Sequence, residues 1–199
     1  MVRHIGLLPQ GELLAPAKAV AILDMNPPLR ASQPDESGVP IVGQMAPDLV
    51  GFVELNDDEA RAVQANIEDI RRRVPHSTTR QMSHHAIRQY VALPAFEDKP
   101  LVAGGPSMLK CSCVGFVLLA YRDVIQLIDD SNLPPIPLNR ILEIWPINVQ
   151  LLQLAGLRGQ GPWPVHLPGY VFHAMGRERK DLPYRPRSGD EHFDATQQQ

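Results

Sequence analysis

The chain has 199 residues, of which 44% are hydrophobic and 21% charged, a composition that predicts one globular domain with a sizeable core. The net charge of −3 and the lack of a dense Lys/Arg stripe argue against nucleic acid as the main partner. No apolar run is long enough to predict a transmembrane helix, and the N-terminus does not resemble a signal peptide. Two cysteines form no disulfide framework, so a cytoplasmic location is expected.

The N-terminal quarter predicts short strands joined by loops. The sequence Pro9-Gln10-Gly11 separates two apolar runs and predicts a hairpin. Much of the segment from residue 24 to 47 is rich in Pro, Ser, Asp and Gly, which predicts a surface loop. The strands expected in this part are Ile5–Leu8, Glu12–Leu14, Ala19–Leu23, Ile41–Val42 and Val50–Leu55.

Residues 56–74 predict an amphipathic helix. Asn56 and Glu59 have the spacing of a capping box, and Pro75 ends the pattern. Apolar residues recur every three or four positions and would form one buried stripe. They are Ala60, Val63, Ile67, Ile70 and Val74.

A second helix, apolar on nearly all sides, is predicted to begin at Ser112 or Cys113 and to reach about Ile128. Such a helix is expected to be buried at the centre of the domain. Before it, residues 86–93 fit either a strand or a short helix.

The last third predicts two short helices, Leu138–Trp145 and Asn148–Ala155, the second ended by Gly156. A late strand is expected within Val165–Ala174. From residue 177 the chain becomes polar, so the prediction is one domain over residues 1–176 followed by a disordered tail over residues 177–199.

Cys111 and Cys113 lie one residue apart, directly before the apolar run. Free cysteines are among the most buried residue types, so both could be core residues. A zinc site is a second interpretation, although a Cys-x-Cys pair lacks the usual spacing of zinc ligands. Its further ligands would come from His84, His85, His166 and His173. No cofactor or resident metal is expected.

The third interpretation makes Cys113 a nucleophile. A thiol in the first turn of a helix faces unpaired N–H groups and the positive end of the helix dipole, which favour the reactive thiolate. The same N–H groups can hold an oxyanion during acyl transfer. Cys113 fits better than Cys111 because the apolar run begins directly after it, and because Gly115 is expected to leave open space beside the thiol.

The stretch CVGFVLLAY, which begins at Cys113, resembles the nucleophile helix of the NlpC-type papain-like cysteine hydrolases. That helix typically reads Cys-Ser-Gly-Phe/Leu-Val, with an aromatic residue eight positions after the cysteine. Gly115, Phe116, Val117 and Tyr121 match this pattern, whereas Val114 departs from it.

The stretch HIGLLPQGELLAPA, which begins at His4, is similar to the family's strand and hairpin that carry the catalytic histidine. A histidine that precedes the cysteine is typical of the circularly permuted branch, which includes the lecithin retinol acyltransferase-like proteins. The segment RDVIQLIDDSNLPPIP, residues 122–137, also looks like that branch. The resemblance covers roughly residues 1–145 in patches.

This resemblance implies an α+β papain-like fold, with a small antiparallel sheet packed on the buried nucleophile helix. It also implies a thiol hydrolase or acyltransferase that acts on an amide or ester, such as a peptide, an isopeptide or a lipid ester. Cys113 would be the nucleophile and His4 the base, and no third residue that orients the imidazole can be named.

Two alternatives remain open. His166 follows the cysteine at a distance that suits the unpermuted order of the family, so it is the rival base. A non-catalytic binding protein with the same fold and a degenerate site is the rival function. Nothing in the sequence predicts the oligomeric state.

Overall fold

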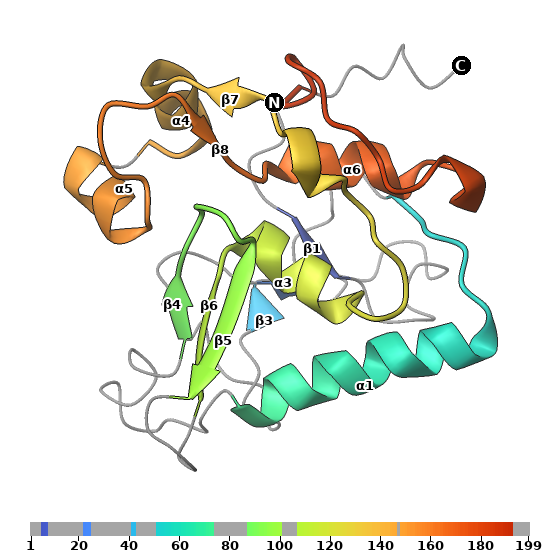
Figure 1. The fold of residues 1–199 in the computed structure, drawn as a ribbon. Helices are drawn as coiled ribbons and strands as arrows, with labels where there is room; N and C mark the ends of the chain where they lie inside the picture. The colour runs from blue at the N-terminus through green and yellow to red at the C-terminus, as the bar shows by residue number, and fades with distance from the viewer. Residues whose placement is uncertain are drawn as a thin grey trace.

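The computed structural model describes residues 5–7, 22–24, 41–42, 51–73, 87–100, 107–146 and 148–192. Within these residues the fold is mixed α+β, with helices and small sheets around one central helix (Figure 1). The helices are α1 (Asp57–Arg73), α3 (Cys113–Ala120), η2 (Asp130–Asn132), α4 (Leu138–Ile144), α5 (Val149–Leu154), α6 (Pro168–Met175) and η3 (Arg179–Asp181). The strands are β1 (Gly6–Leu7), β2 (Ile22–Asp24), β3 (Ile41–Val42), β4 (Ile87–Gln89), β5 (Phe96–Pro100), β6 (Ser107–Cys111), β7 (Pro135–Ile136) and β8 (Trp163–Pro164).

The strands form three small sheets. The N-terminal sheet is antiparallel, in the order β1-β2-β3, with Leu7 opposite Leu23 and Leu23 opposite Ile41. In the second sheet β6 is central, antiparallel to β5 and parallel to β4. The pair β7 and β8 completes the set. In the predicted N-terminal hairpin, residues 12–14 lie outside the described residues.

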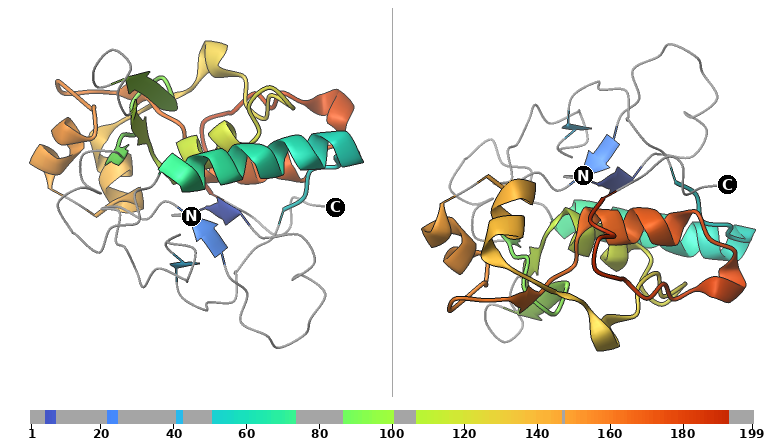
Figure 2. Two further views of the ribbon diagram at one scale, coloured as in Figure 1. Left: turned by 90° about the horizontal axis from the view of Figure 1, so that it is seen from below. Right: turned by 90° about the horizontal axis from the view of Figure 1, so that it is seen from above.

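Helix α3 lies at the centre of the fold, with α1 and α6 on either side of it (Figure 1). The N-terminal sheet and the β4-β6-β5 sheet flank α3 on different sides in both views of Figure 2. Leu118 is the only residue of α3 that is not buried, as expected for a helix that is apolar on nearly all sides. The core therefore forms around α3.

The predicted helix over residues 56–74 is confirmed as α1. The main-chain N–H of Asn56 donates to Glu59 Oε2 at 3.0 Å, and the N–H of Glu59 donates to Asn56 Oδ1 at 3.0 Å. These reciprocal bonds are the predicted capping box. On the buried side, Asn66 Nδ2 donates to the carbonyl oxygens of Ala120 and Arg122 at 3.0 and 3.1 Å. Asn66 thus joins α1 to the C-terminal end of α3, where carbonyls lack helical partners.

The prediction that the central helix reaches Ile128 is wrong, because α3 ends at Ala120. Three residues after the end of the helix, Asp123 takes a left-handed conformation, with φ of 62°. Residues 125–129 then continue as an extended segment beside the C-terminal part of the chain. Tyr184 N–H donates to Leu127 O at 2.9 Å, and Asp129 N–H donates to Tyr184 O at 2.8 Å.

These backbone bonds also show that residues 177–192, which belong to the predicted disordered tail over residues 177–199, are part of the folded domain. Residues 177–192 pack on the domain: Tyr184 is buried, and Glu191 is only 5% exposed. Glu191 accepts from Arg140 Nη2 at 2.9 Å, so its charge is paired where it is removed from water. Residues 193–199 lie outside the described part of the chain.

Two predicted strands are also wrong. Residues 51–55 have no regular secondary structure, although partly buried and exposed residues alternate along them. The segment expected to hold a late strand contains α6 instead, which starts at Pro168. Proline suits the first turn of a helix, where its missing N–H is not needed. The two short helices predicted before it are confirmed as α4 and α5.

Candidate active site

Cys113 is the first residue of α3, as predicted. Ser112 caps the helix: its Oγ accepts from the N–H of Gly115 at 3.1 Å, and its carbonyl oxygen accepts from the N–H of Phe116 at 2.8 Å. The N–H groups of Cys113 and Val114 belong to the same first turn, where N–H groups lack helical partners and the positive end of the helix dipole lies.

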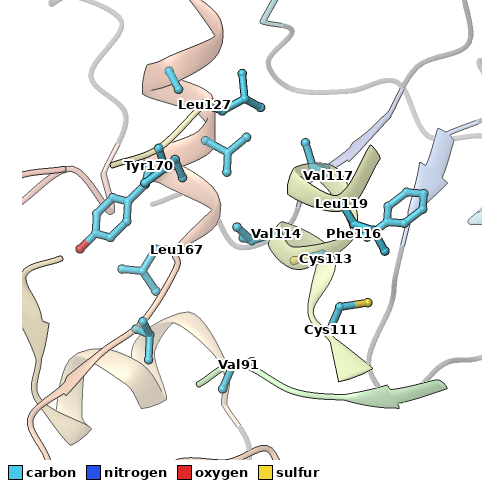
Figure 3. Packing of buried hydrophobic residues seen from close by; sticks show 14 of the residues in the cluster. Val91, Cys111, Cys113, Val114, Phe116, Val117, Leu119, Leu127, Leu167 and Tyr170 are labelled. Carbon is cyan, nitrogen blue, oxygen red and sulfur yellow. The ribbon is translucent and has the colours of Figure 1, made fainter. Parts of the chain in front are cut away.

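Both cysteines are free and buried. Cys111 ends β6 and has no exposed surface, and Cys113 is 2% exposed. Figure 3 shows them at the junction of strand and helix, with Cys113 among buried apolar side chains. Burial, and to a lesser degree the nearby Cys113, raises the pKa of the Cys111 thiol far above its usual value. A raised pKa disfavours the thiolate, so Cys111 is the weaker candidate for the nucleophile.

The expectation that Gly115 leaves open space beside the thiol is wrong. A Cβ atom at Gly115 would lie 2.0 Å from the carbonyl oxygen of Ala95 and 2.9 Å from Cys111 Cβ. The space is filled by the backbone of the segment that leads into β5. Gly115 is therefore required for packing, because any side chain would collide with Ala95.

His4, the predicted base, lies outside the described residues. The described chain begins with Ile5, and β1 starts at the next residue. Strand β1 packs against α3, and Leu7 of this strand is buried in the core that contains Cys113. The strand that resembles the family's histidine strand therefore contacts the helix that begins with Cys113.

His166, the rival base, is 1% exposed and lies two residues after the end of β8. Its Nε2 is 2.6 Å from Asp130 Oδ1. Because an ionised carboxylate can only accept, Asp130 accepts this hydrogen bond. The other ring nitrogen, Nδ1, is buried without a hydrogen-bond partner. Within the described part of the chain, His166 is thus paired with Asp130 and makes no hydrogen bond to Cys113.

The Asp130–His166 pair was not predicted from the sequence. The two residues are 36 positions apart, and Asp130 stands in a polar turn where aspartate is common. No local pattern signals such a contact.

The described residues contain no group of three or more His, Cys, Asp or Glu side chains that could hold a metal ion. Of the histidines considered for zinc, His84 and His85 lie outside the described residues. His173 Nε2 is 2.9 Å from the main-chain oxygen of His192, in the C-terminal part of the fold.

The described surface has a hollow of about 490 Å³ beside the C-terminal half of α3. It is lined by residues 94–96, Leu118, residues 122–128 and Asp130. Cys113 is not among the lining residues, but Ala95 lines the hollow and contacts Gly115. The hollow and the first turn of α3 thus share one stretch of backbone.

None of the helices in the described part of the chain combines the length and the apolar character needed to cross a membrane. Comparison with known protein families, with curated proteins and with solved structures finds no match to this chain.

Proposed function

We propose that this chain is a papain-like thiol hydrolase or acyltransferase, with Cys113 as the nucleophile and His4 as the base. One observation carries the proposal: Cys113 begins a buried helix, and the strand that follows His4 packs against this same helix. A cysteine nucleophile needs an adjacent base, and in the papain-like fold that the chain resembles this base lies on a strand beside the nucleophile helix. The resemblance of both segments to the permuted NlpC-type branch supports the same assignment.

The proposed reaction begins when His4 takes the proton from the Cys113 thiol. The thiolate attacks the carbonyl carbon of an amide or ester, and main-chain N–H groups in the first turn of α3 stabilise the oxyanion. His4 then protonates the leaving amine or alcohol, and a thioester forms on Cys113. Water or a second acceptor cleaves this thioester. Peptides, isopeptides and lipid esters are the proposed substrate classes, and the cytoplasm is the proposed location.

A second candidate function is a non-catalytic binding protein with the same fold. The low exposure of Cys113, 2%, favours it, because a substrate carbonyl must reach the sulfur atom. The two candidates differ in one measurable property, which is the reactivity of the Cys113 thiol.

The test is thiol labelling of the folded protein with iodoacetamide between pH 5 and 9, read by mass spectrometry of each cysteine. We expect Cys113 to react below neutral pH and far faster than Cys111, whose pKa is raised. Cys111→Ser is the matched control, since it removes the neighbouring thiol and leaves the nucleophile. Slow labelling of both cysteines in folded protein would favour the binding protein.

The base is tested with His4→Ala and His166→Ala, using an aryl ester and a peptide anilide as substrates. We expect His4→Ala and Cys113→Ser to abolish turnover, and His166→Ala to keep most of it. Loss of turnover in His166→Ala, with His4→Ala active and both variants folded by circular dichroism, would assign the unpermuted order instead.

A further inference from the structure

The hollow beside α3 has the size of a small-molecule site. Its volume is about 490 Å³, within the usual range of roughly 300–1,000 Å³ for ligand pockets. One wall is the segment over residues 94–96, and the other is the segment over residues 122–128, where the chain leaves α3. Neither wall contains the candidate nucleophile.

The inside of this hollow is apolar. Leu127 and Ile128 are buried beneath it. Around them, Leu118, Val124 and Ile125 are packed against the core but keep part of their surface in solvent. Partly exposed aliphatic side chains gathered in one concave surface favour an apolar ligand, because binding removes them from water.

The charged side chains that line the hollow give it a net negative charge. Arg122 is its one positive group, and its guanidinium is already paired with Asp69, at 3.5 Å. The negative groups are Asp123 and Asp130. The uncompensated charge is therefore that of carboxylates.

Asp130 is held in place more firmly than an ordinary surface carboxylate. Its Oδ1 accepts from Nε2 of His166, which is 99% buried, while half of the Asp130 side chain remains exposed. The other ring nitrogen of His166, Nδ1, is buried and has no hydrogen-bond partner in the described structure. The histidine thus orients the carboxylate, and the exposed half of the Asp130 side chain stays open to a ligand.

We infer that this hollow binds a ligand with an apolar body and a cationic amine, the amine paired with Asp130. The apolar walls take the body of the ligand, and the oriented carboxylate selects an ammonium over an alcohol or a carboxylate. This inference rests on the hollow and its charges, and does not depend on the proposed chemistry at Cys113.

The inference is tested by calorimetry at pH 8 on the Cys113→Ser protein, in which no acyl transfer can occur. The probes are n-hexylamine, 1-hexanol and hexanoate, which share one apolar body and differ in charge. A hydrogen bond between charged groups is expected to make hexylamine bind about tenfold tighter than hexanol. Hexanoate should bind most weakly. In the NMR spectrum of the same protein, hexylamine should shift the methyl signals of Leu118, Val124 and Ile125.

The discriminating variant is Asp130→Asn, which keeps an acceptor for His166 and removes the charge. It should lose about tenfold in hexylamine affinity and bind hexanol as before. Asp181→Asn, in η3 and outside the hollow, is the matched control and should change neither. Equal binding of all three probes, tighter binding of hexanoate, or methyl shifts confined to the exposed Leu151 and Leu154 of α5 would overturn the inference. The methyl shifts need no substitution at Asp130, so they test the inference even if Asp130→Asn does not fold.

Discussion

Substitution of Gly115 by alanine should destabilise the protein, although alanine is the better helix former. In an exposed helix interior this change gains about 1 kcal/mol. Here the new Cβ atom would lie 2.0 Å from the carbonyl oxygen of Ala95. The obstacle is main chain and not the flexible end of a side chain, so either α3 or the Ala95 segment must move.

The size of the effect follows from these two opposing contributions. Adding a carbon to a well-packed core costs typically about 1–3 kcal/mol, and a backbone obstacle places Gly115→Ala at the upper end. After the gain in helix propensity, about 2 kcal/mol of net destabilisation remains. For a chain of this length, that lowers the melting temperature by roughly 4–8 °C.

The assay is urea unfolding followed by circular dichroism, with Gly159→Ala as the comparison. Gly159 has φ of 79° and no atom within 4 Å of its added Cβ, so alanine there carries only the conformational cost, about 1 kcal/mol. Gly115→Ala should therefore be the less stable of the two variants. If Gly115→Ala were as stable as the unmodified protein, the close approach of Ala95 to α3 would be refuted.

Two further predictions concern the helix N-termini. Ser112→Ala removes the buried cap of α3 and should lower the free energy of unfolding in urea by about 1 kcal/mol. The control is Ser131→Ala, in an exposed turn, which should change the free energy of unfolding by less than about 0.5 kcal/mol. The hydrogen bond from Arg179 and, to a lesser degree, the hydrogen bond from the Asn56 N–H lower the pKa of Glu59 from 4.5 to about 2. The Glu59 carboxylate therefore stabilises the folded protein fully above pH 4.5, and this contribution is lost as the pH falls towards 2. Glu59→Gln keeps the capping box, and its stability deficit should shrink over that interval; a deficit independent of pH would contradict the charge pairing.

The elements predicted correctly are those whose signals are local. Asn56 and Glu59 cap α1 through atoms three residues apart, and one turn of sequence is enough to recognise that pattern. The start of α3 is of the same kind, because Ser112 caps it through Gly115. The position of the candidate nucleophile was predictable for this reason.

The errors come from contacts between residues distant in the sequence. The apolar run after Ala120 fits a helix, but its backbone pairs with Tyr184, more than fifty residues later. That pairing draws residues 125–129 out of the helix and, by the same bonds, fixes part of the segment whose polar composition suggested disorder. One long-range contact thus explains two wrong predictions.

In the candidate site, too, the local features were predictable and the long-range contacts were not. Cys113 at the start of a helix follows from local pattern, whereas the Asp130–His166 pair joins two turns that no periodicity connects. The surroundings of the thiol were also missed, because the occupant of the space beside Gly115 is the backbone of Ala95. A carbonyl oxygen of a distant loop has no signature in the sequence.

Packing explains several of the residues that match the cysteine-hydrolase motif. Gly115 matches the family motif, yet contact with Ala95 requires a glycine there whether or not the protein is an enzyme. Phe116 and Val117 are likewise explained by burial in the core. Packing thus accounts for these neighbours of Cys113, and their agreement with the motif adds little evidence for catalysis. Burial in the core accounts for Cys113 as well, because free cysteine is among the most buried residue types. The case for chemistry therefore depends on the reactivity of this one sulfur atom, which is why thiol labelling can separate the enzyme from the binding protein.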